Sequence, residues 1–521
     1  MTARIPFVFY GDGPRLPSGL GRIARDILLR LLPEEEELGI VVHQVGVDPP
    51  DGWHWQGWPF WGFQPDSHDQ GRAAMEQVVE ELSAQYGHPP IIFMIMDPSR
   101  CYDLTRMAER RDGVQQQLDA RFWAYFPIDS ENVQGRLSGP AAESIWTCDR
   151  LLGYGRYGAR VLRSTVEAMT AKVLARPSHA PRMVQVPPIS YLPHGLDTSF
   201  RPGVPLEETG PAFTKWRLNL PGDVWVLGCV ATNQARKDLS LLFGAASLLK
   251  REGASVAVWL HTDRLTNAWD VGQLCLDFGF ERPEVCVSLT DTPLTDEQLA
   301  ARYWASDVTL GVGLGEGFGY PLVESLACGT PVVHGAFAGG MELLPRRDWL
   351  VDPVAWRLES CYAVKRPVFR PEDMAGAIAL AAAWKRGHPA LCAAYCRGAV
   401  SYLSWDQLWP RWRAWIRNGL IEERGVYGQR RAGQYVQPGT TGRPHHAADQ
   451  GVRPVPAPAP GGRRGPAPGE GGHLLAGPES RSEYAPVSPG GDGGALASRG
   501  LRDGGAGGRG NPRPDQGAGR E

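Results

Sequence analysis

The sequence predicts an α/β protein built from two parallel-sheet domains. Ahead of residue 430, short apolar runs rich in β-branched and aromatic residues alternate with helical patterns, which is typical of parallel α/β architecture. The Pro-rich stretch of residues 193–211 separates these runs into two groups, and we interpret it as a linker. With 521 residues the chain is long enough for two or three domains, each with its own core.

The expected strands fall in residues 1–200 and residues 201–400, which we assign as an N-terminal and a C-terminal domain. After them, apolar residues on one helical face of Tyr402–Ile416 predict a closing helix over residues 401–425, interrupted by Pro410. The expected strands are Ile5–Tyr10, Ile91–Ile95, Phe122–Phe126 and Leu151–Tyr154 in the first domain, and Trp225–Ala231, Ala257–His261, Val308–Val312 and Pro331–Val333 in the second.

The composition changes abruptly near residue 430. Residues 431–521 contain 23 Gly, 13 Pro and no Lys, and they hold hardly any large apolar side chains. Such a segment cannot bury enough surface to offset its chain entropy. We therefore expect residues 426–521 to form a disordered tail rich in Gly, Pro and Arg.

Bulk charge and cysteine usage limit the partners and the compartment. The formal net charge is −3, from 54 basic and 57 acidic residues, so the whole chain gives no electrostatic case for nucleic acid or anionic membrane. Nine cysteines are scattered without a CxxC pair, which fits a reducing cytosol better than a disulfide framework or a zinc site. No apolar run is long enough for a membrane span, so we expect a soluble, cytoplasmic protein for which peripheral membrane contact stays open.

A Gly-rich loop in the second domain has the properties of a site for a phosphate ester. Gly313–Tyr320 carries four glycines among eight residues, and it joins the expected strand Val308–Val312 to a short helix, Pro321–Cys328. This order directs the unpaired amides of the helix N-terminus to the carboxyl end of the sheet, where phosphate is favoured. Glu316 in the loop and Glu324 in the helix can accept hydrogen bonds from sugar or ribose hydroxyls.

A second loop of this domain carries two cations at an equivalent strand end. Arg236 and Lys237 lie in Thr232–Asp238, between the expected strand Trp225–Ala231 and the helix Leu239–Lys250. A guanidinium fork and an ammonium at that place can neutralise a diphosphate. An isolated pair of this kind is more often a solvated loop pair, but two such loops in one domain favour a donor pocket.

Several segments together resemble a known enzyme family. EGFGYPLVESLACGTPVV, which starts at Glu316, resembles the Glu-x7-Glu signature of retaining GT-B glycosyltransferases, family 4 (glycosyl transferases group 1) in particular. SGLGRIARDI at 18–27, LPHGLDTSFRP at 192–202 and TNQARKD at 232–238 resemble the family's first Gly-rich loop, interdomain segment and basic diphosphate loop, in the family's order. The resemblance implies two Rossmann-like domains facing a central cleft.

The same resemblance implies an activity and a role for each matching residue. A hexosyltransferase-like enzyme of this kind moves a sugar from a nucleoside-diphosphate sugar with retention of anomeric configuration. Glu316 would contact the donor sugar, Glu324 would hold the ribose, and Arg236 and Lys237 would stabilise the departing diphosphate. Backbone amides of the same loop would support sugar or phosphate, at Gly317, Phe318 and Gly319.

The sequence contains no Asp-x-Asp triplet, which agrees with the metal-independent chemistry usual for this architecture. We therefore expect no metal and no cofactor, and a nucleotide sugar only as substrate. In the first domain, Gly19 and Gly21 can bring backbone close to a ligand at the start of a helix near Leu20. SGLG alone is more often a plain surface turn, but its position after the first strand favours a functional loop.

One departure from the family concerns the end of a first-domain strand. Many family 4 enzymes carry a His there, near the donor sugar, whereas the matching strand FWAYF is followed by Pro127, Ile128 and Asp129. We assign Asp129 to that place as a catalytic candidate that orients a donor hydroxyl or helps the acceptor lose its proton. A loop Asp that caps the next turn is an equal alternative.

An aromatic cluster and a histidine stay outside this assignment. Aromatic faces stack on sugar rings or sit at membrane interfaces, so the cluster would suit an acceptor site, although loop packing is the favoured interpretation. His194 we interpret as part of a structural hinge. The cluster consists of Trp53, Trp55, Trp58, Phe60, Trp61 and Phe63.

Three functions remain at this point. The leading one is sugar transfer from a nucleotide sugar to an unidentified acceptor, whether glycan, lipid, protein or small molecule. A nucleotide-sugar epimerase on the same architecture is the second, and a non-catalytic binder of nucleic acid or glycan is the third. The tail has 11 Arg against 8 Asp plus Glu, a weak charge excess for binding nucleic acid.

Overall fold

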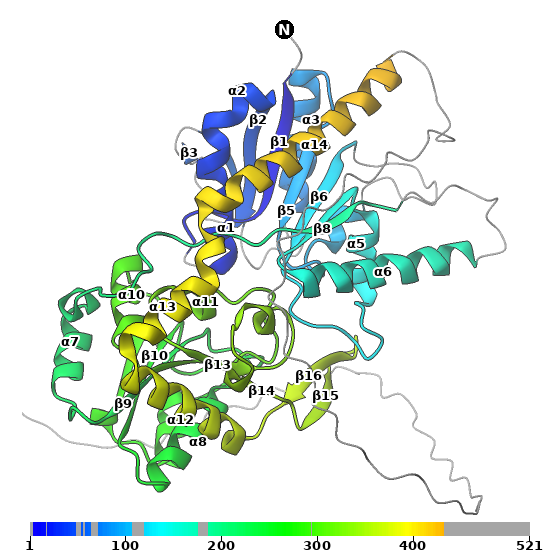
Figure 1. Ribbon diagram of the computed structural model, residues 1–521. Coiled ribbons are helices and arrows are strands. Elements are labelled where there is room, and N and C mark those ends of the chain that lie inside the picture. The colour runs from blue at the N-terminus through cyan, green and yellow to red at the C-terminus, as the bar shows by residue number, and fades with distance from the viewer. Residues whose placement is uncertain are drawn as a thin grey trace, which may run out of the picture. The chain divides into compact units, whose positions relative to one another are not determined.

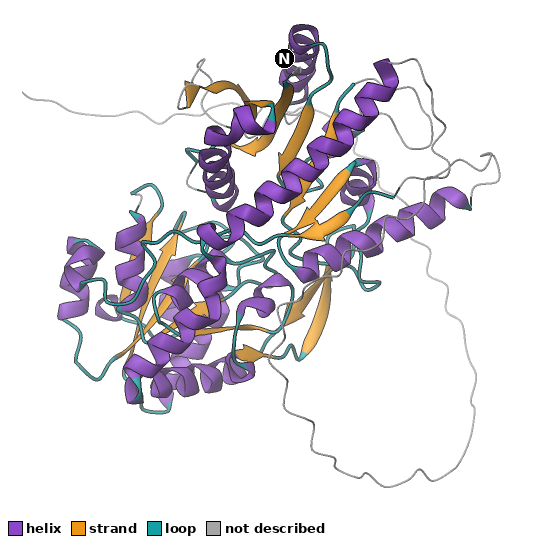
Figure 2. Cartoon of the chain, turned by 45° about the horizontal axis from the view of Figure 1, so that its top comes forward, coloured by secondary structure: helices purple, strands orange, loops and turns teal. Residues whose placement is uncertain are grey.

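The computed structural model describes residues 4–16, 18–47, 54–55, 58–63, 71–106, 119–175, 186–292 and 294–431. Two parallel sheets with helices packed on their faces make up this part, one from each half of the chain (Figure 1, Figure 2). The expected tail lies, from residue 432 onward, outside the described residues, as does Trp53. Among the helices that are described, none combines the length and the apolar character needed to cross a bilayer.

The first sheet has eight strands in the order β3-β4-β2-β1-β5-β6-β7-β8, and all neighbours run parallel except β3 and β4. Its strands are β1 (Ile5–Asp12), β2 (Ile40–Val47), β3 (His54–Trp55), β4 (Trp58–Phe63), β5 (Ile91–Ile95), β6 (Arg121–Phe126), β7 (Arg150–Gly153) and β8 (Ile189–Tyr191). Its helices are α1 (Gly19–Leu31), α2 (Glu35–Leu38), α3 (Arg72–Tyr86), α4 (Tyr102–Thr105), α5 (Gly139–Thr147) and α6 (Arg156–Leu174).

Burial on both faces explains the sequence of the central strands. Strand β5 reads IIFMI and is buried along its whole length, because helices cover both faces of a parallel sheet. Strand β2 was not expected, since His43 and Gln44 interrupt its apolar run, yet both side chains are buried. The aromatic segment Trp58–Phe63 is strand β4, paired with β2, and not the loop that the sequence suggested.

The second sheet has six parallel strands in the order β11-β10-β9-β12-β13-β14. Its strands are β9 (Trp225–Val230), β10 (Val256–Thr262), β11 (Val285–Leu289), β12 (Val308–Gly311), β13 (Val332–Gly335) and β14 (Leu350–Val351). Its helices are α7 (Pro211–Leu218), α8 (Leu239–Arg251), α9 (Val271–Asp277), α10 (Asp296–Trp304), α11 (Tyr320–Ala327), α12 (Pro371–Gly387) and α13 (Pro389–Val400). An antiparallel hairpin, β15 (Ala355–Glu359) with β16 (Val364–Val368), follows β14 and was not expected.

The last helix, α14 (Trp405–Arg431), returns from the second half and packs on the first sheet (Figure 1). The Trp412 side chain is fully buried and its indole nitrogen donates to the carbonyl of Pro193 at 3.0 Å. The Trp415 ring lies 5.3 Å from that of Trp123 in β6. The helix continues through Pro410 and extends six residues past the expected end at residue 425. Both sheets and α14 therefore belong to one unit of the chain.

The strand order of each sheet indicates where a ligand site is expected. Each sheet has a point where the chain turns from one side to the other, between β1 and β5 in the first sheet and between β9 and β12 in the second. At such a point the loops after the two strands diverge and leave room for a ligand at the carboxyl ends of the strands. The Gly-rich and basic loops of the sequence follow β1, β9 and β12.

Candidate functional site

The two loops at the second sheet's switch point are held side by side by backbone hydrogen bonds. The amide of Asp238 donates to the carbonyl of Val312 at 2.9 Å, and the amide of Leu314 donates to the carbonyl of Arg236 at 2.8 Å. The basic loop after β9 and the Gly-rich loop after β12 therefore form one rigid surface. The sequence predicted this meeting from the equivalent positions of the loops on their strands.

Lys237 and Glu316 face one another across these loops. The Lys237 ammonium forms an ion pair with Glu316 Oε1, and the two side chains are only 11% and 17% exposed. Burial raises the pKa of Glu316, but Lys237 and Arg236 outweigh it and hold that pKa below its usual value. Burial lowers the pKa of Lys237, against the opposing effect of Glu316. The result is a buried, charged pair at the carboxyl end of the sheet.

Asp129 joins this group from the first half of the chain. Its carboxylate lies between two guanidinium groups, with Oδ2 3.8 Å from Arg236 Nε and Oδ1 3.7 Å from Arg366 Nη1. Gly315 permits the approach, because a Cβ there would lie 2.2 Å from the carbonyl oxygen of Asp129. The next helix, α5, has Ser138 at its N-cap, so Asp129 does not cap that helix.

A cavity of about 260 Å³ opens beside this ion-pair group. Its walls come from both halves of the chain: the ends of β5 and β6, the start of α5, the basic loop and the β15–β16 hairpin. The hairpin reaches the first half directly, since the Lys365 amide donates to the Glu131 carbonyl at 2.7 Å. Polar side chains on the walls include Asp97, Ser99, Asn132, Arg136, Arg236 and Arg366. Such a lining suits a hydroxyl-rich ligand.

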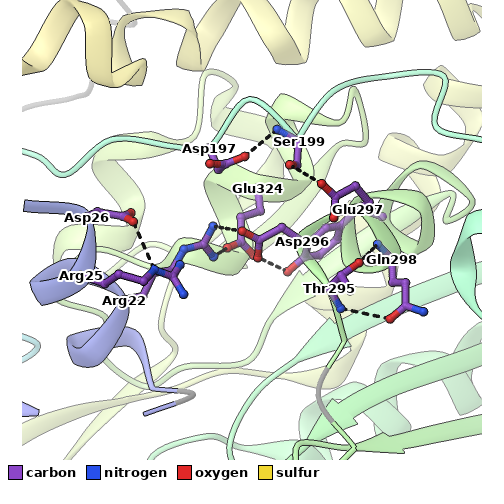
Figure 3. Close-up of polar contacts among 11 residues, drawn as sticks. Arg22, Arg25, Asp26, Asp197, Ser199, Thr295, Asp296, Glu297, Gln298 and Glu324 are labelled. Atoms are coloured by element: carbon purple, nitrogen blue, oxygen red, sulfur yellow. Dashed lines mark hydrogen bonds and ion pairs between the residues drawn. The ribbon is translucent and has the colours of Figure 1, made fainter. Parts of the chain in front are cut away.

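Glu324 lies apart from this cavity, inside α11 and 2% exposed. Its Oε2 accepts a hydrogen bond from the Tyr303 hydroxyl at 2.9 Å, and its Oε1 lies 2.5 Å from Arg22 Nη1 of helix α1 (Figure 3). Burial raises the pKa of Glu324 although Arg22 and Tyr303 oppose that rise. Arg22 was not singled out from the sequence. Its place directly after Gly19 and Gly21, in the Gly-rich loop of the first half, was the available signal.

The remaining backbone positions of the Gly-rich loop surround the start of α11. Gly319 is the N-cap of that helix with φ of 99°, a conformation that favours glycine. Gly317 packs against Pro127 of the first half. The Phe318 ring is buried 4.0 Å from the ring of His194, so its side chain fills the core and leaves only its backbone for a ligand.

The Gly-rich loop of the first half starts α1. Ser18 caps the helix, since its Oγ accepts the Gly21 amide at 2.9 Å and donates to Asp12 Oδ2 at 2.5 Å. Gly21 has no room for a side chain, because a Cβ would lie 2.7 Å from two carbonyl oxygens, whereas Gly19 has open space around it. Of the two glycines, only Gly21 is required by packing.

His194 lies in the core between the two halves. Its Nδ1 is 2.7 Å from the Tyr125 hydroxyl, and its ring also packs against Tyr320. Burial lowers its pKa well below the usual range, so the imidazole is neutral at pH 7. Among the residues that are described, no three His, Cys, Asp or Glu side chains gather closely enough to hold a metal ion.

Comparison with solved structures identifies the architecture. Sucrose-phosphate synthase from Thermosynechococcus elongatus superposes with a TM-score of 0.53 at 16% identity, covering 82% of this chain and 100% of that chain. A trehalose-6-phosphate protein from E. coli, bound with UDP-2-fluoro glucose, superposes with a TM-score of 0.55 at 13% identity over 79% and 99%. The fold is GT-B. At these identities the likeness establishes the fold alone.

Sequence comparison gives shorter matches. No protein-family model matches the chain. D-inositol 3-phosphate glycosyltransferases are 32% identical over 175 residues in Xylanimonas cellulosilytica and 34% identical over 203 residues in Streptosporangium roseum. These matches cover 32% and 35% of this chain, and the chain spans 41% and 45% of the length of those two curated relatives. The relatives are glycosyltransferases, and the similarity is confined to part of each chain.

Proposed function

We propose that this GT-B protein is a metal-independent, retaining glycosyltransferase of family 4 that moves a sugar from a nucleoside-diphosphate sugar to a hydroxyl of an acceptor. The observation that carries the proposal is the charged group of Arg236, Lys237 and Glu316 at the switch point of the second sheet. It combines cations for a diphosphate with a carboxylate for a sugar, next to the N-terminus of α11.

The chemistry follows from where charge develops. As the glycosidic bond to the diphosphate breaks, negative charge accumulates on the departing phosphate oxygens, and preorganised cations stabilise it. Arg236, Lys237 and backbone amides of the Gly-rich loop Gly313–Tyr320 would serve this role, which a divalent metal serves in other enzymes. Glu316, kept ionised by its neighbours, would accept hydrogen bonds from donor hydroxyls and fix the sugar ring.

Glu324 would take the ribose hydroxyls, and the cavity beside Asp129 would admit the acceptor. Retention requires that the acceptor hydroxyl attack from the face that the diphosphate leaves, and the cavity is lined by Arg236, which we assign to the diphosphate. Asp129 would orient the donor or acceptor hydroxyl there. The acceptor is a glycan, lipid, protein or small molecule with a free hydroxyl, and a cytoplasmic location would supply the nucleotide sugar.

The comparisons support a UDP-sugar as the first donor to test. Solved structures of similar fold include the E. coli protein bound with UDP-2-fluoro glucose and an Anabaena protein, HepE, in complex with UDP and glucose. We expect one of UDP, GDP, ADP, CDP or TDP to raise the melting temperature, with a smaller rise for Lys237→Met. A folded protein that is stabilised by none of the five would contradict the proposal. A nucleotide sugar that is converted only into another nucleotide sugar would favour the epimerase.

A further inference from the structure

A charged contact joins the Gly-rich loop of the first half to the carboxylate we assign to ribose. Arg22 and Glu324 are 302 residues apart, and Arg22 Nη1 lies 2.5 Å from Glu324 Oε1. Arg22 Nη2 also lies 3.5 Å from Asp296 Oδ2, at the start of α10 (Figure 3). The guanidinium of Arg22, from the first half of the chain, therefore lies against two carboxylates from the second half.

This contact leaves Glu324 no access for a ligand. Both of its oxygens are engaged, one by Arg22 and the other by Tyr303, and the side chain is 3% exposed. A ribose diol needs two acceptor positions on one carboxylate, in line with its two hydroxyls. A diol that contacts both oxygens can share Oε2 with the Tyr303 hydroxyl, but it reaches Oε1 only if Arg22 moves away.

The surroundings of Arg22 offer its side chain other contacts after such a move. Its guanidinium carbon lies 4.8 Å from the Tyr320 ring and 5.1 Å from the Phe200 ring, and its side chain is 14% exposed. Its Nε is buried without a hydrogen-bond partner among the described residues, so the guanidinium is incompletely satisfied. Asp296, 34% exposed and already in contact, offers a second carboxylate for the released charge.

We propose that Arg22 occupies the ribose subsite and that the donor's ribose diol displaces it toward Asp296. The inference rests on the proposed function, which assigns Glu324 to ribose. Every donor that binds must then break the Arg22–Glu324 pair, so the pair lowers nucleotide affinity. Occupancy of the ribose subsite is thereby coupled to the position of the Arg22 side chain on α1. A ligand that prefers the released state shifts the population toward it.

The test compares UDP binding to wild type, Arg22→Gln and Arg25→Gln by calorimetry. Arg25 is the matched control, since it lies on the same helix, has a side chain that is 39% exposed and, among the residues that the structure describes, forms its ion pair with the neighbouring Asp26. We expect UDP to bind Arg22→Gln about 5-fold tighter, the lower end of typical coupling between a conformation and a ligand. Arg25→Gln should bind like wild type. UDP lacking both ribose hydroxyls should show no gain with Arg22→Gln.

The outcomes separate this inference from the proposed function. Equal or weaker UDP binding by Arg22→Gln, with wild type binding UDP, overturns the displacement and leaves the function standing. Failure of wild type and both variants to bind UDP, GDP, ADP, CDP or TDP overturns both. If Arg22→Gln does not fold, Asp296→Asn replaces it: loss of the released side chain's partner should weaken UDP binding about 2- to 5-fold, the range of a partly exposed ion pair. Unchanged binding by that variant would overturn the inference.

Discussion

The Lys237–Glu316 pair allows a prediction that separates stability from catalysis. Removing one member of a buried ion pair costs about 3–5 kcal/mol, because the other charge stays desolvated and unpaired. At 11% and 17% exposure the pair lies near that limit, so Lys237→Met should lower the free energy of unfolding by about 3 kcal/mol. Glu316→Gln should cost less, since burial already lowers the pKa of Lys237 and the lysine can lose its proton.

The double variant decides the question. The double variant, Lys237→Met with Glu316→Gln, leaves neither charge buried. Its loss of unfolding free energy should therefore be well below the sum of the losses in the two single variants. Its turnover of the nucleotide sugar should stay as low as that of Lys237→Met, because the Lys237 ammonium no longer faces the departing diphosphate and Arg236 alone remains there. Urea denaturation followed by tryptophan fluorescence gives the first quantity and release of nucleoside diphosphate the second. Additive stability losses would refute the buried-pair reasoning, and recovered turnover would refute the diphosphate role.

The pH dependence of the same variants has a definite sign. In wild type, the pKa of Glu316 is lowered, so its contribution to stability is present above its ordinary value of 4.5 and is lost as the pH falls below it. In Lys237→Met, burial still raises that pKa while the opposing effect of Lys237 is lost and Arg236 remains, so the pKa should be higher than in wild type and ionisation of Glu316 above about pH 4.5 should stabilise the variant less. The stability gap between wild type and variant should therefore be wide at pH 7 and narrow toward pH 4. A gap independent of pH would contradict the ionised pair.

The other predictions concern single functions. Arg236→Ala should cut turnover about 10- to 150-fold, or roughly 1.5–3 kcal/mol from one charge-assisted contact, and unchanged kinetics would remove it from the diphosphate site. Glu324→Gln should mainly raise the donor KM and Glu316→Gln should mainly lower kcat; the reverse pattern would mean that the two roles are exchanged. Asp129→Asn should lower kcat with nucleotide affinity nearly intact, as calorimetry can check, and a wild-type kcat would leave Asp129 without a catalytic part. Deleting the residues after Arg431 should leave melting temperature and turnover unchanged, because that segment contains few large apolar residues. A deletion that also removes α14 should give insoluble protein, because it exposes the apolar surface that α14 covers. A large drop in melting temperature or turnover from the shorter deletion would contradict this prediction.

Much of the architecture could be predicted from the sequence because parallel strands between helices are continuous apolar runs. Strand β5 matches its expected bounds, and β9, β10 and β12 differ by a residue or so. The β15–β16 hairpin could not be found in this way, since most of β15 is exposed and its sequence AWRLE mixes charged and apolar residues. The domain bounds at residues 200 and 400 stay a prediction.

The proximity of the candidate site residues was predictable where it depends on one sheet and was missed where it depends on both. Lys237 and Glu316 follow neighbouring strands, so strand order alone brings them together. The contacts of Arg22 with Glu324 and of Arg366 with Asp129 join distant segments whose approach no local pattern encodes. The roles of Gly317, Phe318 and Gly319 toward a donor stay predictions, and the structure limits Phe318 to its backbone.

The most direct test of the account is a mass balance on the reaction. Purified protein is incubated with the nucleotide sugar whose nucleotide gives the largest thermal shift and with a panel of hydroxyl acceptors, and all products are quantified by mass spectrometry and NMR. The account predicts one nucleoside diphosphate released for each sugar found in glycosidic linkage, with the anomeric configuration of the donor, and loss of both products in the Glu316→Gln variant. Recovery of the sugar solely as a different nucleotide sugar, or a glycoside of inverted configuration, would contradict it.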